Sequence, residues 1–281
     1  MCGILNFNKK RGVRVKKYYL QRLALIITEK CNLDCAHCVR GKKCNKDISD
    51  EIIEKTFEQV DLVGCVAING GEPTLVIDKI EKIIDSIIKR QIKLEQFTIT
   101  INGTIYSEEL LRLLDEIDRY IGDDTVSSLF AISLDNYHID EMKKLGILEN
   151  FIDNYKRYKK SKHFYGTREI DFKLFREGNA ENLDESITVP LRPMQQYVSY
   201  VDSKRYGDVC CIGPLVTVNV DGIVTECDAS NVNQRSIYNY GNILDDSIEN
   251  IVLSNGALVV PYKKYEKITY KTLKKYWSYN E

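Results

Sequence analysis

Several features that mark specialised classes of protein are scarce or missing in this sequence. No apolar run approaches the roughly 20 residues that a helix needs to cross a bilayer, so we expect no membrane-spanning segment. The formal net charge of the 281 residues is only −1, so no overall field favours nucleic acid or an anionic membrane. Only 5 prolines are present and no low-complexity linker divides the chain, which favours one main domain.

A disulfide-rich secreted fold is not expected either, although the chain contains 9 cysteines. No secretory signal pattern precedes them, and reducing compartments keep thiols free. We therefore expect a cytoplasmic protein whose cysteines are unpaired or bind metal.

The two ends of the chain are basic although the whole is nearly neutral. Residues 1–20 carry six basic residues and no acid, and residues 262–281 carry six lysines among aromatic residues. Such a tail could pair with phosphates and stack on RNA bases. A solvated surface, or a tyrosine-rich helix packed on the core, gives the same pattern and is favoured. Nucleic acid is therefore not expected as a partner.

From residue 22 onward, apolar runs alternate with amphipathic stretches. The runs typical of buried strands cover residues 23–27, 63–68, 96–101, 129–134 and 170–175. Helical patterns follow Ser49 and Ser107, cover 139–158, and include the apolar stripe Ile77, Ile80, Ile84, Ile87 and Ile88. Strand–helix alternation predicts right-handed crossovers and an α/β fold with a parallel sheet, either open or closed into a barrel.

A β-hairpin is expected beyond this core. Residues 215–220 and 223–227 flank Asp221-Gly222, a pair that favours a type I′ turn, and the hairpin would bring Cys227 towards Cys210 and Cys211. We therefore divide the chain into a basic N-terminal extension (1–21), an α/β core (22–205) and a small appendage with a helical tail (206–281).

Three cysteines follow the first predicted strand within eight residues. Cys31, Cys35 and Cys38 form Cys-x3-Cys-x2-Cys, which lets one loop present three sulfurs to one metal centre. Thiolates are soft ligands and select iron–sulfur clusters or zinc. Three ligands leave one position open, as a catalytic site requires, whereas a closed zinc site would need His37 or Cys44 as fourth ligand.

Polar and glycine residues follow the other predicted strands. In a parallel α/β sheet, ligands bind at the carboxyl ends of the strands. Each of these residues could instead serve a turn or a helix cap, but they fall along one rim. They are Gly70, Gly71, Glu72 and Pro73 after the second strand, Asn102, Gly103 and Thr104 after the third, Ser133, Asp135, Tyr137 and His138 at the fourth, and Gly178, Asn179 and Ala180 after the fifth.

Cys-x3-Cys-x2-Cys after the first strand, with Gly-Gly-Glu-Pro after the second, resembles the radical S-adenosylmethionine (radical SAM) superfamily over about residues 22–180. The resemblance implies a partial (β/α)6 TIM-like barrel. It also implies an enzyme that reductively cleaves S-adenosylmethionine at a [4Fe–4S] cluster and uses the 5′-deoxyadenosyl radical to abstract hydrogen from its substrate. An electron donor such as flavodoxin or ferredoxin is implied as a partner.

Site roles follow from the same resemblance. Cys31, Cys35 and Cys38 would hold three irons, while S-adenosylmethionine would chelate the fourth. Backbone groups of Gly70, Gly71 and Glu72 would receive the methionine amine, with Pro73 completing this cofactor-binding segment. Ser133 and Asp135 would contact the ribose or carboxylate. Asn102 and Thr104 would also contact this ligand, and Gly178 to Ala180 would lie against the adenine. His37 would point away from the cluster, as a residue behind the ligands or on the surface.

The second cysteine group resembles the opening of the auxiliary-cluster domains called SPASM and twitch. Cys210 or Cys211, Gly222 and Cys227 fit that pattern, as does Gly241-Asn242-Ile243. No cysteine follows Cys227, so later ligands are missing, and a cluster-free appendage is favoured over a second cluster.

The substrate is least well determined by the sequence. The run from Ser133 to His138 resembles the Ser-x-Asp-x-Tyr-His run of radical peptide epimerases, so we expect a peptide substrate that is epimerised or crosslinked. A sugar or nucleoside substrate, or RNA, is the alternative.

Overall fold

Parallel strands form the centre of the molecule. The computed structural model describes residues 17–122, 126–168, 174–190, 195–203, 207–225 and 239–260. Its central sheet contains β1 (Lys17–Ile26), β2 (Leu62–Asn69), β3 (Lys93–Ile101), β4 (Ser128–Ser133) and β5 (Phe164–Arg168), each parallel to its neighbours in sequence order. Strands and helices alternate along the chain, and the described strands do not close into a barrel. This confirms the predicted α/β fold of the partial-barrel type.

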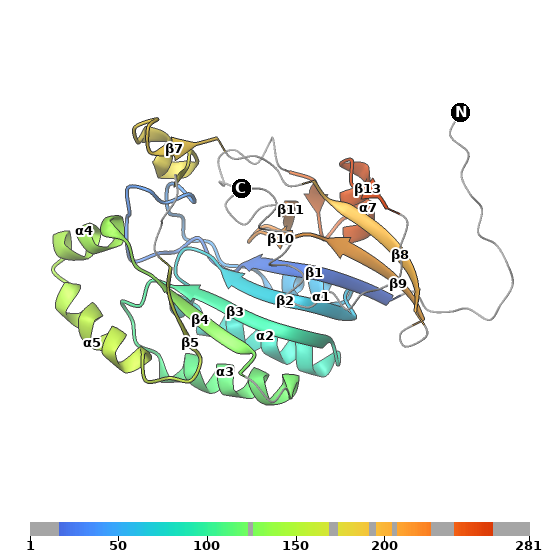
Figure 1. Cartoon of the computed structure of the whole chain (residues 1–281), viewed down its shortest axis with the longest axis horizontal. Helices are drawn as coiled ribbons and strands as arrows, with labels where there is room; N and C mark the ends of the chain where they lie inside the picture. Colours follow the sequence, from blue (N-terminus) through green and yellow to red (C-terminus); the bar gives the residue numbers. More distant parts are fainter. Residues whose placement is uncertain are drawn as a thin grey trace, which may run out of the picture.

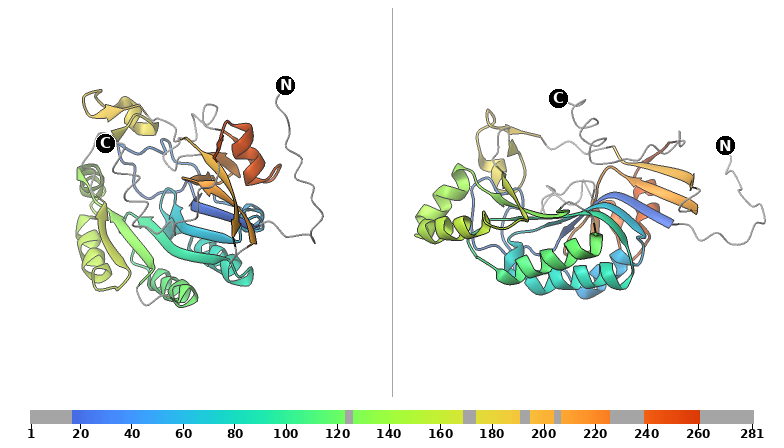
Figure 2. Two further views of the ribbon diagram at one scale, coloured as in Figure 1. Left: turned by 45° about the vertical axis from the view of Figure 1, so that its right-hand side comes forward. Right: turned by 60° about the horizontal axis from the view of Figure 1, so that its bottom comes forward.

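Helices cover one face of this sheet (Figures 1 and 2). They are α1 (Asp50–Phe57), α2 (Ile77–Lys89) and α3 (Glu108–Ile121). Ser49 and Ser107 cap α1 and α3 by accepting hydrogen bonds from backbone N–H groups three residues on. The predicted isoleucine stripe is confirmed, since Ile80, Ile84 and Ile87 are fully buried. They pack in a core shared with alternate strand residues such as Leu25, Ile68 and Ile99.

The predicted helix over 139–158 is two helices. α4 (Asn136–Lys144) begins earlier because Asp135 caps it, accepting from the His138 N–H at 3.0 Å. Gly146 then adopts φ +69°, a left-handed conformation that ends helices. α5 (Leu148–Tyr158) then begins as a separate helix.

The predicted fifth strand was misplaced. The strand that pairs with β4 is β5 at 164–168, whereas residues 169–173 lie outside the described part. Leu174–Phe175 form β6, which pairs with β7 (Thr188–Val189) in a separate small sheet. The sequence did not predict β5 because none of its five residues is fully buried, so it has no continuous apolar run.

The C-terminal part joins the main sheet at β1. The first half of β1 pairs in parallel with β9 (Gly207–Gly213) and its second half with β10 (Val216–Val218). Around these lie β8 (Tyr197–Ser203), β11 (Ile223–Thr225), β12 (Gly241–Asn242), α7 (Ile248–Ser254) and β13 (Leu258–Val259). The appendage therefore extends the sheet of the core, while the proposed domain boundaries stay predictions.

The β10–β11 hairpin is confirmed, but its turn is not type I′. A type I′ turn needs positive φ at both central residues. Gly222 has φ +81°, whereas Asp221 is not among the residues with positive φ. The Gly222 N–H donates to the Asn219 carbonyl at 2.9 Å, so Asp221 is a central residue of the turn and Gly222 follows it.

A short segment of residues 174–190 lies over the loop that follows β1 (Figure 1). It contains β6, the 3₁₀ helix η2 (Gly178–Asn182) and β7. A second 3₁₀ helix, η1 (Pro73–Leu75), follows β2 and has Pro73 at its first turn. No helix in the described ranges is long and apolar enough to cross a membrane.

Candidate functional site

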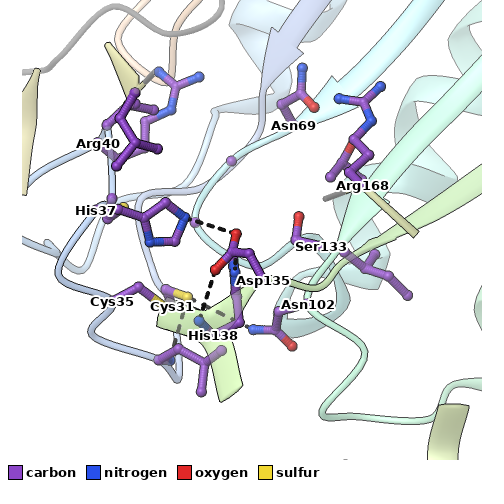
Figure 3. Close-up of a pocket in the computed structure, with 18 of the residues that line it drawn as sticks. Cys31, Cys35, His37, Arg40, Asn69, Asn102, Ser133, Asp135, His138 and Arg168 are labelled. Carbon is purple, nitrogen blue, oxygen red and sulfur yellow. Dashed lines mark hydrogen bonds and ion pairs between the residues drawn. The ribbon is translucent and has the colours of Figure 1, made fainter. Parts of the chain in front are cut away.

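A cavity of about 790 Å³ lies at the carboxyl ends of the parallel strands (Figure 3). The loop after β1 contributes Cys31, Cys35 and Cys38 to its wall, and the loop after β2 contributes Gly70 and Gly71. Asn102, Ser133 and Asp135 line it from the ends of β3 and β4. The tertiary structure therefore brings residues from four strand ends, spread over 105 positions of sequence, to one place.

Local hydrogen bonds shape the cysteine loop. The Cys38 N–H donates to the Cys35 carbonyl at 3.1 Å, and the Gly41 N–H donates to the Cys38 carbonyl at 3.1 Å. Asn179 of η2 clamps the same loop: its N–H donates to the Cys38 carbonyl at 2.9 Å and its side-chain Nδ2 to the Cys35 carbonyl at 3.0 Å. These contacts fix the backbone of Cys35 and Cys38, so the fold holds these two thiols in place.

The thiols are poorly solvated. Burial raises the pKa of Cys31 to about 11, and burial with the charges of Cys31 and Cys38 raises the pKa of Cys35 to about 12. Thiols in this setting stay protonated at neutral pH unless a cation compensates them. A cationic metal group would supply that compensation and release the protons.

The spacing of the thiols fits a multi-iron group better than one ion. In the described part of the chain, the set of His, Cys and acidic side chains close enough to share one ion is Cys35, His37 and His138, whose ligand atoms lie within 4.8 Å of one another. Cys31 and Cys38 are not in that set. A zinc ion bound at about 2.3 Å by all three sulfurs would require them to be. The zinc alternative is further weakened because Cys44 donates to Glu29 Oε2 at 2.6 Å.

The Gly-Gly pair fits close against the start of the cysteine loop. The Gly71 N–H donates to the Thr28 carbonyl at 2.7 Å and the Glu72 N–H to the Lys30 carbonyl at 2.8 Å. A Cβ at Gly70 would lie 2.8 Å from the Thr28 carbonyl oxygen, and one at Gly71 would overlap the Lys30 carbonyl. Glycine is therefore required here by the packing of two loops against each other.

We expect Gly71→Ala to lower the free energy of unfolding by about 1–3 kcal/mol, because the methyl group forces the two loops apart. The same displacement moves Cys31, so the iron content after reconstitution should also fall. Thermal unfolding and iron analysis measure the two effects. Gly256→Ala is the matched control: its φ of +84° strains the backbone, but no atom lies within 4 Å of the added Cβ. Unchanged iron binding in Gly71→Ala would contradict the expectation.

Glu72 is buried and ties two strand ends together. Its Oε1 accepts from the Thr74 N–H at 3.1 Å and the Thr74 hydroxyl at 2.6 Å, and its Oε2 accepts from the Asn102 N–H at 2.6 Å. Burial raises the pKa of Glu72, while these hydrogen bonds act in the opposite direction. The Glu72 side chain and Pro73 do not line the cavity, so the carboxyl group holds the loop that forms it.

Asn102 and Thr104 form a closed polar ring with Asn32. Asn32 Nδ2 donates to the Thr104 hydroxyl at 2.7 Å, that hydroxyl donates to Asn102 Oδ1 at 2.7 Å, and Asn102 Nδ2 donates to Asn32 Oδ1 at 2.8 Å. Asn102 lines the cavity, and its Nδ2 also lies 3.9 Å from the Cys31 sulfur. The ring connects the β3 end to the cysteine loop.

Asp135 lies between two imidazoles. Its Oδ2 is 3.2 Å from His37 Nε2 and 2.9 Å from His138 Nδ1 (Figure 3). Burial alone would raise the pKa of Asp135, but the hydrogen bonds from His138 and His37 outweigh it and hold the pKa well below its usual range. The His37 ring also stacks on Tyr137 with centroids 4.7 Å apart. His37 is 8% exposed and lines the cavity, so its surface placement was wrong, and it contacts Asp135 behind the cysteine loop.

The sequence prediction missed several residues that line the cavity. Among them are Asn69, the last residue of β2, and Arg168, the exposed last residue of β5. Arg168 pairs in register with Ser133 across β4 and β5. The misplaced fifth strand explains this miss, because Arg168 was assigned to no strand end.

The cavity and its cysteine loop can now be compared with known proteins. A sequence model of the radical SAM superfamily matches residues 25–166, just over half of the chain. The chain belongs to the radical SAM superfamily. It is therefore an enzyme, and the superfamily implies a [4Fe–4S] cluster, S-adenosylmethionine and a source of electrons. The three poorly solvated thiols, which are too far apart to share one ion, fit that cluster.

Two known proteins are similar to this radical SAM enzyme, one in sequence and one in structure. An uncharacterized protein of Methanocaldococcus jannaschii is 24% identical over 251 residues, which cover 74% of this chain and 85% of the relative. The solved structure of native anSMEcpe with bound AdoMet and Cp18Cys peptide has a TM-score of 0.51 and 16% identity, covering 83% of this chain and 80% of that one. This second likeness shows a shared fold.

Gly178 packs against the radical SAM cysteine loop, and Ala180 is buried in the same 3₁₀ helix. Gly178 has φ +60°, and a Cβ there would lie 2.5 Å from the Cys38 carbonyl oxygen. Ala180 is fully buried. Neither residue lines the cavity, so their contact with adenine stays a prediction.

The second cysteine group is divided between different environments. Cys210 packs in the large core, and Cys211 packs with Tyr19 and Val209 in a smaller cluster. Adjacent residues of a strand point to opposite faces, so the two thiols do not share one site. Cys227 lies outside the described residues, and a second iron–sulfur cluster is not shown.

Proposed function

We propose that this radical SAM enzyme modifies a peptide, by epimerisation at Cα or by crosslinking of side chains. The observation that carries the proposal is the single cavity that joins the three thiols, the Gly-Gly loop and the ends of β3 to β5. Its volume of about 790 Å³ is within the range of ligand pockets and leaves room for a substrate group beside a bound cofactor. Arg168 lines this cavity and is exposed to solvent, so the cavity is open to solvent at that wall.

Two further observations support a peptide. The run Ser133-x-Asp135-x-Tyr137-His138 beside the cavity resembles that of radical peptide epimerases. Its side chains lie close together in the structure, since Asp135 contacts His138 and Tyr137 stacks on His37. The neighbour with the same fold, anSMEcpe, was solved with a peptide bound.

The residues of this chain have distinct roles in the proposal. When bound, the cluster and S-adenosylmethionine supply the 5′-deoxyadenosyl radical. Cys31, Cys35 and Cys38 hold the cluster. Ser133 and Arg168 offer a hydroxyl and a positive charge at the opposite wall, which suit the carboxylate of S-adenosylmethionine. The hydrogen-bonded ring of Asn32, Asn102 and Thr104 keeps the cysteine loop and the β3 end in place.

We expect the anaerobically reconstituted enzyme, with dithionite and S-adenosylmethionine, to change a peptide encoded by a small open reading frame beside its gene. In D2O, epimerisation adds one deuterium at Cα, because the radical removes the Cα hydrogen atom and an exchangeable thiol returns a deuterium atom. Crosslinking removes two hydrogens, one as an atom taken by the radical and one as a proton whose electron passes to an electron acceptor. Mass spectrometry distinguishes the two products. 5′-Deoxyadenosine should form in parallel, and Cys38→Ala should abolish both. Deuterium transfer from a labelled sugar or nucleoside into 5′-deoxyadenosine, with every tested peptide unchanged, would instead assign a small-molecule substrate.

A further inference from the structure

The sheet face that bears the large cavity continues beyond it towards the amino-terminal ends of the strands. Asn69 of β2 and Thr100 of β3 line the cavity. Successive strand residues point to opposite faces, so Cys65 and Gln96, four residues earlier on the same strands, point to the same face as these two. Both are half-buried, whereas Val66 between them and the cavity is fully buried on the helix side. Four residues of strand span about 13 Å, so this face extends well past the cavity.

Arg22 adds a positive charge to this part of the face. It stands opposite Cys65 in the register of β1 and β2, and Cys65 stands opposite Gln96 in the register of β2 and β3. Thr98 is also half-buried, and its hydroxyl lies 3.7 Å from the Cys65 sulfur. A partly exposed strip of β3 therefore joins Gln96 to the cavity residue Thr100. We call Arg22, Cys65 and Gln96 the Arg22 subsite.

The guanidinium of Arg22 lacks an acidic partner among the described residues. The side chain is half-buried, and its Nε is buried without a hydrogen-bond acceptor. Arginine cannot lose its proton to escape the cost of burial. Buried polar groups are normally hydrogen-bonded, so the position of Arg22 calls for an anion that the folded chain itself does not provide.

No carboxylate on this face compensates the charge of Arg22. Along 22–26, 65–69, 96–100 and 129–133, the alternate positions that share the face of the cavity contain no Asp or Glu. Burial raises the pKa of Cys65, while the charges of Arg22 and Arg168 act in the opposite direction, so both guanidinium groups are near its sulfur. Arg168 also lines the cavity. Positive potential therefore extends from the cavity to Arg22 and favours an anionic ligand.

We propose that the Arg22 subsite binds a carboxylate group of the substrate and so selects acidic substrates and sets which residue reaches the cavity. The inference rests on the proposed function in taking that substrate to be a peptide. A guanidinium binds a carboxylate through two parallel N–H···O bonds, and the Gln96 amide can donate a third. An extended peptide rises about 3.3 Å per residue, so the carboxylate should lie about four residues from the residue that is modified. A C-terminal carboxylate and an acidic side chain share this chemistry.

Alkylation of the Cys65 thiol tests the proposal in the cluster-loaded protein. Iodoacetate and iodoacetamide both lose iodide to the thiolate sulfur, but only iodoacetate carries a carboxylate. The ratio of their rates at Cys65, measured by mass spectrometry, should be about tenfold higher than at the exposed Cys44, because a hydrogen bond to a charged group contributes about that much. Arg22→Gln should make the two ratios equal, and Arg22→Lys should keep part of the difference. A ratio is used because it cancels any change in the amount of Cys65 thiolate.

Competing probes identify the source of the carboxylate. N-acetyl-tetraalanine carries a C-terminal carboxylate, the amide of N-acetyl-Ala-Ala-Asp-Ala carries one on a side chain, and N-acetyl-tetraalanine amide carries neither. The probe that slows the labelling of Cys65 by iodoacetate names the source, while the neutral peptide should have no effect. If neither acidic probe slows it in the wild type, the subsite does not bind a peptide carboxylate and the proposal fails.

Further controls separate this inference from the proposed function. Arg90→Gln removes a half-buried charge that pairs with Glu54 on the helix side, and it should leave the ratio at Cys65 unchanged. Iron content and Tm show whether each variant folds. Equal ratios at Cys65 in wild type and Arg22→Gln, or a Cys65 that neither reagent labels, would overturn the carboxylate subsite. Labelling requires no turnover, so a raised ratio in an enzyme that modifies no peptide would contradict the proposed function alone.

Discussion

Replacing Cys31, Cys35 and Cys38 together by alanine should reduce the iron content of the reconstituted protein from about four per chain to near zero. The structure places these three thiols at one cavity, with Cys35 buried and Cys31 and Cys38 half-buried, so their loss removes all three sulfur ligands from that site. Cleavage of S-adenosylmethionine should disappear with the iron. Anaerobic reconstitution, iron and sulfide analysis and the absorbance near 400 nm measure the result.

The other cysteines provide the controls for this experiment. Cys65 lies on β2, with its sulfur 3.7 Å from the Thr98 hydroxyl, and Cys211 lies in a small apolar cluster. Cys65→Ala and Cys211→Ala should each retain about four irons. If the triple variant kept its iron, the assignment of the cluster would be wrong. Iron that falls from about eight to about four in Cys227→Ala would reveal a second cluster.

Glu72→Gln should destabilise the protein by about 2–3 kcal/mol, or roughly 4–10 °C in Tm, although it changes one atom. The carboxylate accepts from Thr74 at one oxygen and from the Asn102 N–H at the other. An amide has only one acceptor oxygen, so its NH₂ group faces a buried donor whichever way it turns. Because Asn102 lines the cavity, the Kd for S-adenosylmethionine should rise as well.

The effect of Glu72→Gln should depend on pH in a defined direction. Burial raises the pKa of Glu72 above its ordinary 4.5, so the folded protein binds this proton at a higher pH than the unfolded chain. Wild type should therefore gain stability relative to the variant as the pH falls from neutral towards 4.5. Thermal unfolding from pH 7 to 5 measures this trend.

Glu81→Gln is the control for Glu72→Gln. Glu81 pairs with Arg112 on the surface at 3.0 Å, so its loss should cost less than about 1 kcal/mol at any of these pH values. Equal effects at both positions, or a stability difference between wild type and Glu72→Gln that stays constant with pH, would contradict the role given to Glu72.

Periodic patterns predicted the helices and central strands because those elements bury one apolar face each. The isoleucine stripe of α2 and the apolar runs of β1 to β4 are of this kind. β5 has little buried surface and lies beside one strand in the described part. The fifth strand was therefore predicted at the more apolar residues 170–175 instead of at 164–168. Likewise, Gly146 divides α4 from α5 through one backbone angle that the apolar periodicity does not encode.

The sequence alone determined the chemistry, because the spacing of Cys31, Cys35 and Cys38 and the order of Gly70-Gly71 after them are local properties of the chain. The tertiary structure decided what surrounds that chemistry. Contacts between distant segments placed Asp135 between His37 and His138, buried Glu72 against Asn102, and set Asn179 on the cysteine loop. Apart from the local Asp135–His138 pair, these contacts join residues 30 to 144 positions apart, and only the folded chain, whose strand ends share one edge, brings them into hydrogen-bonding distance.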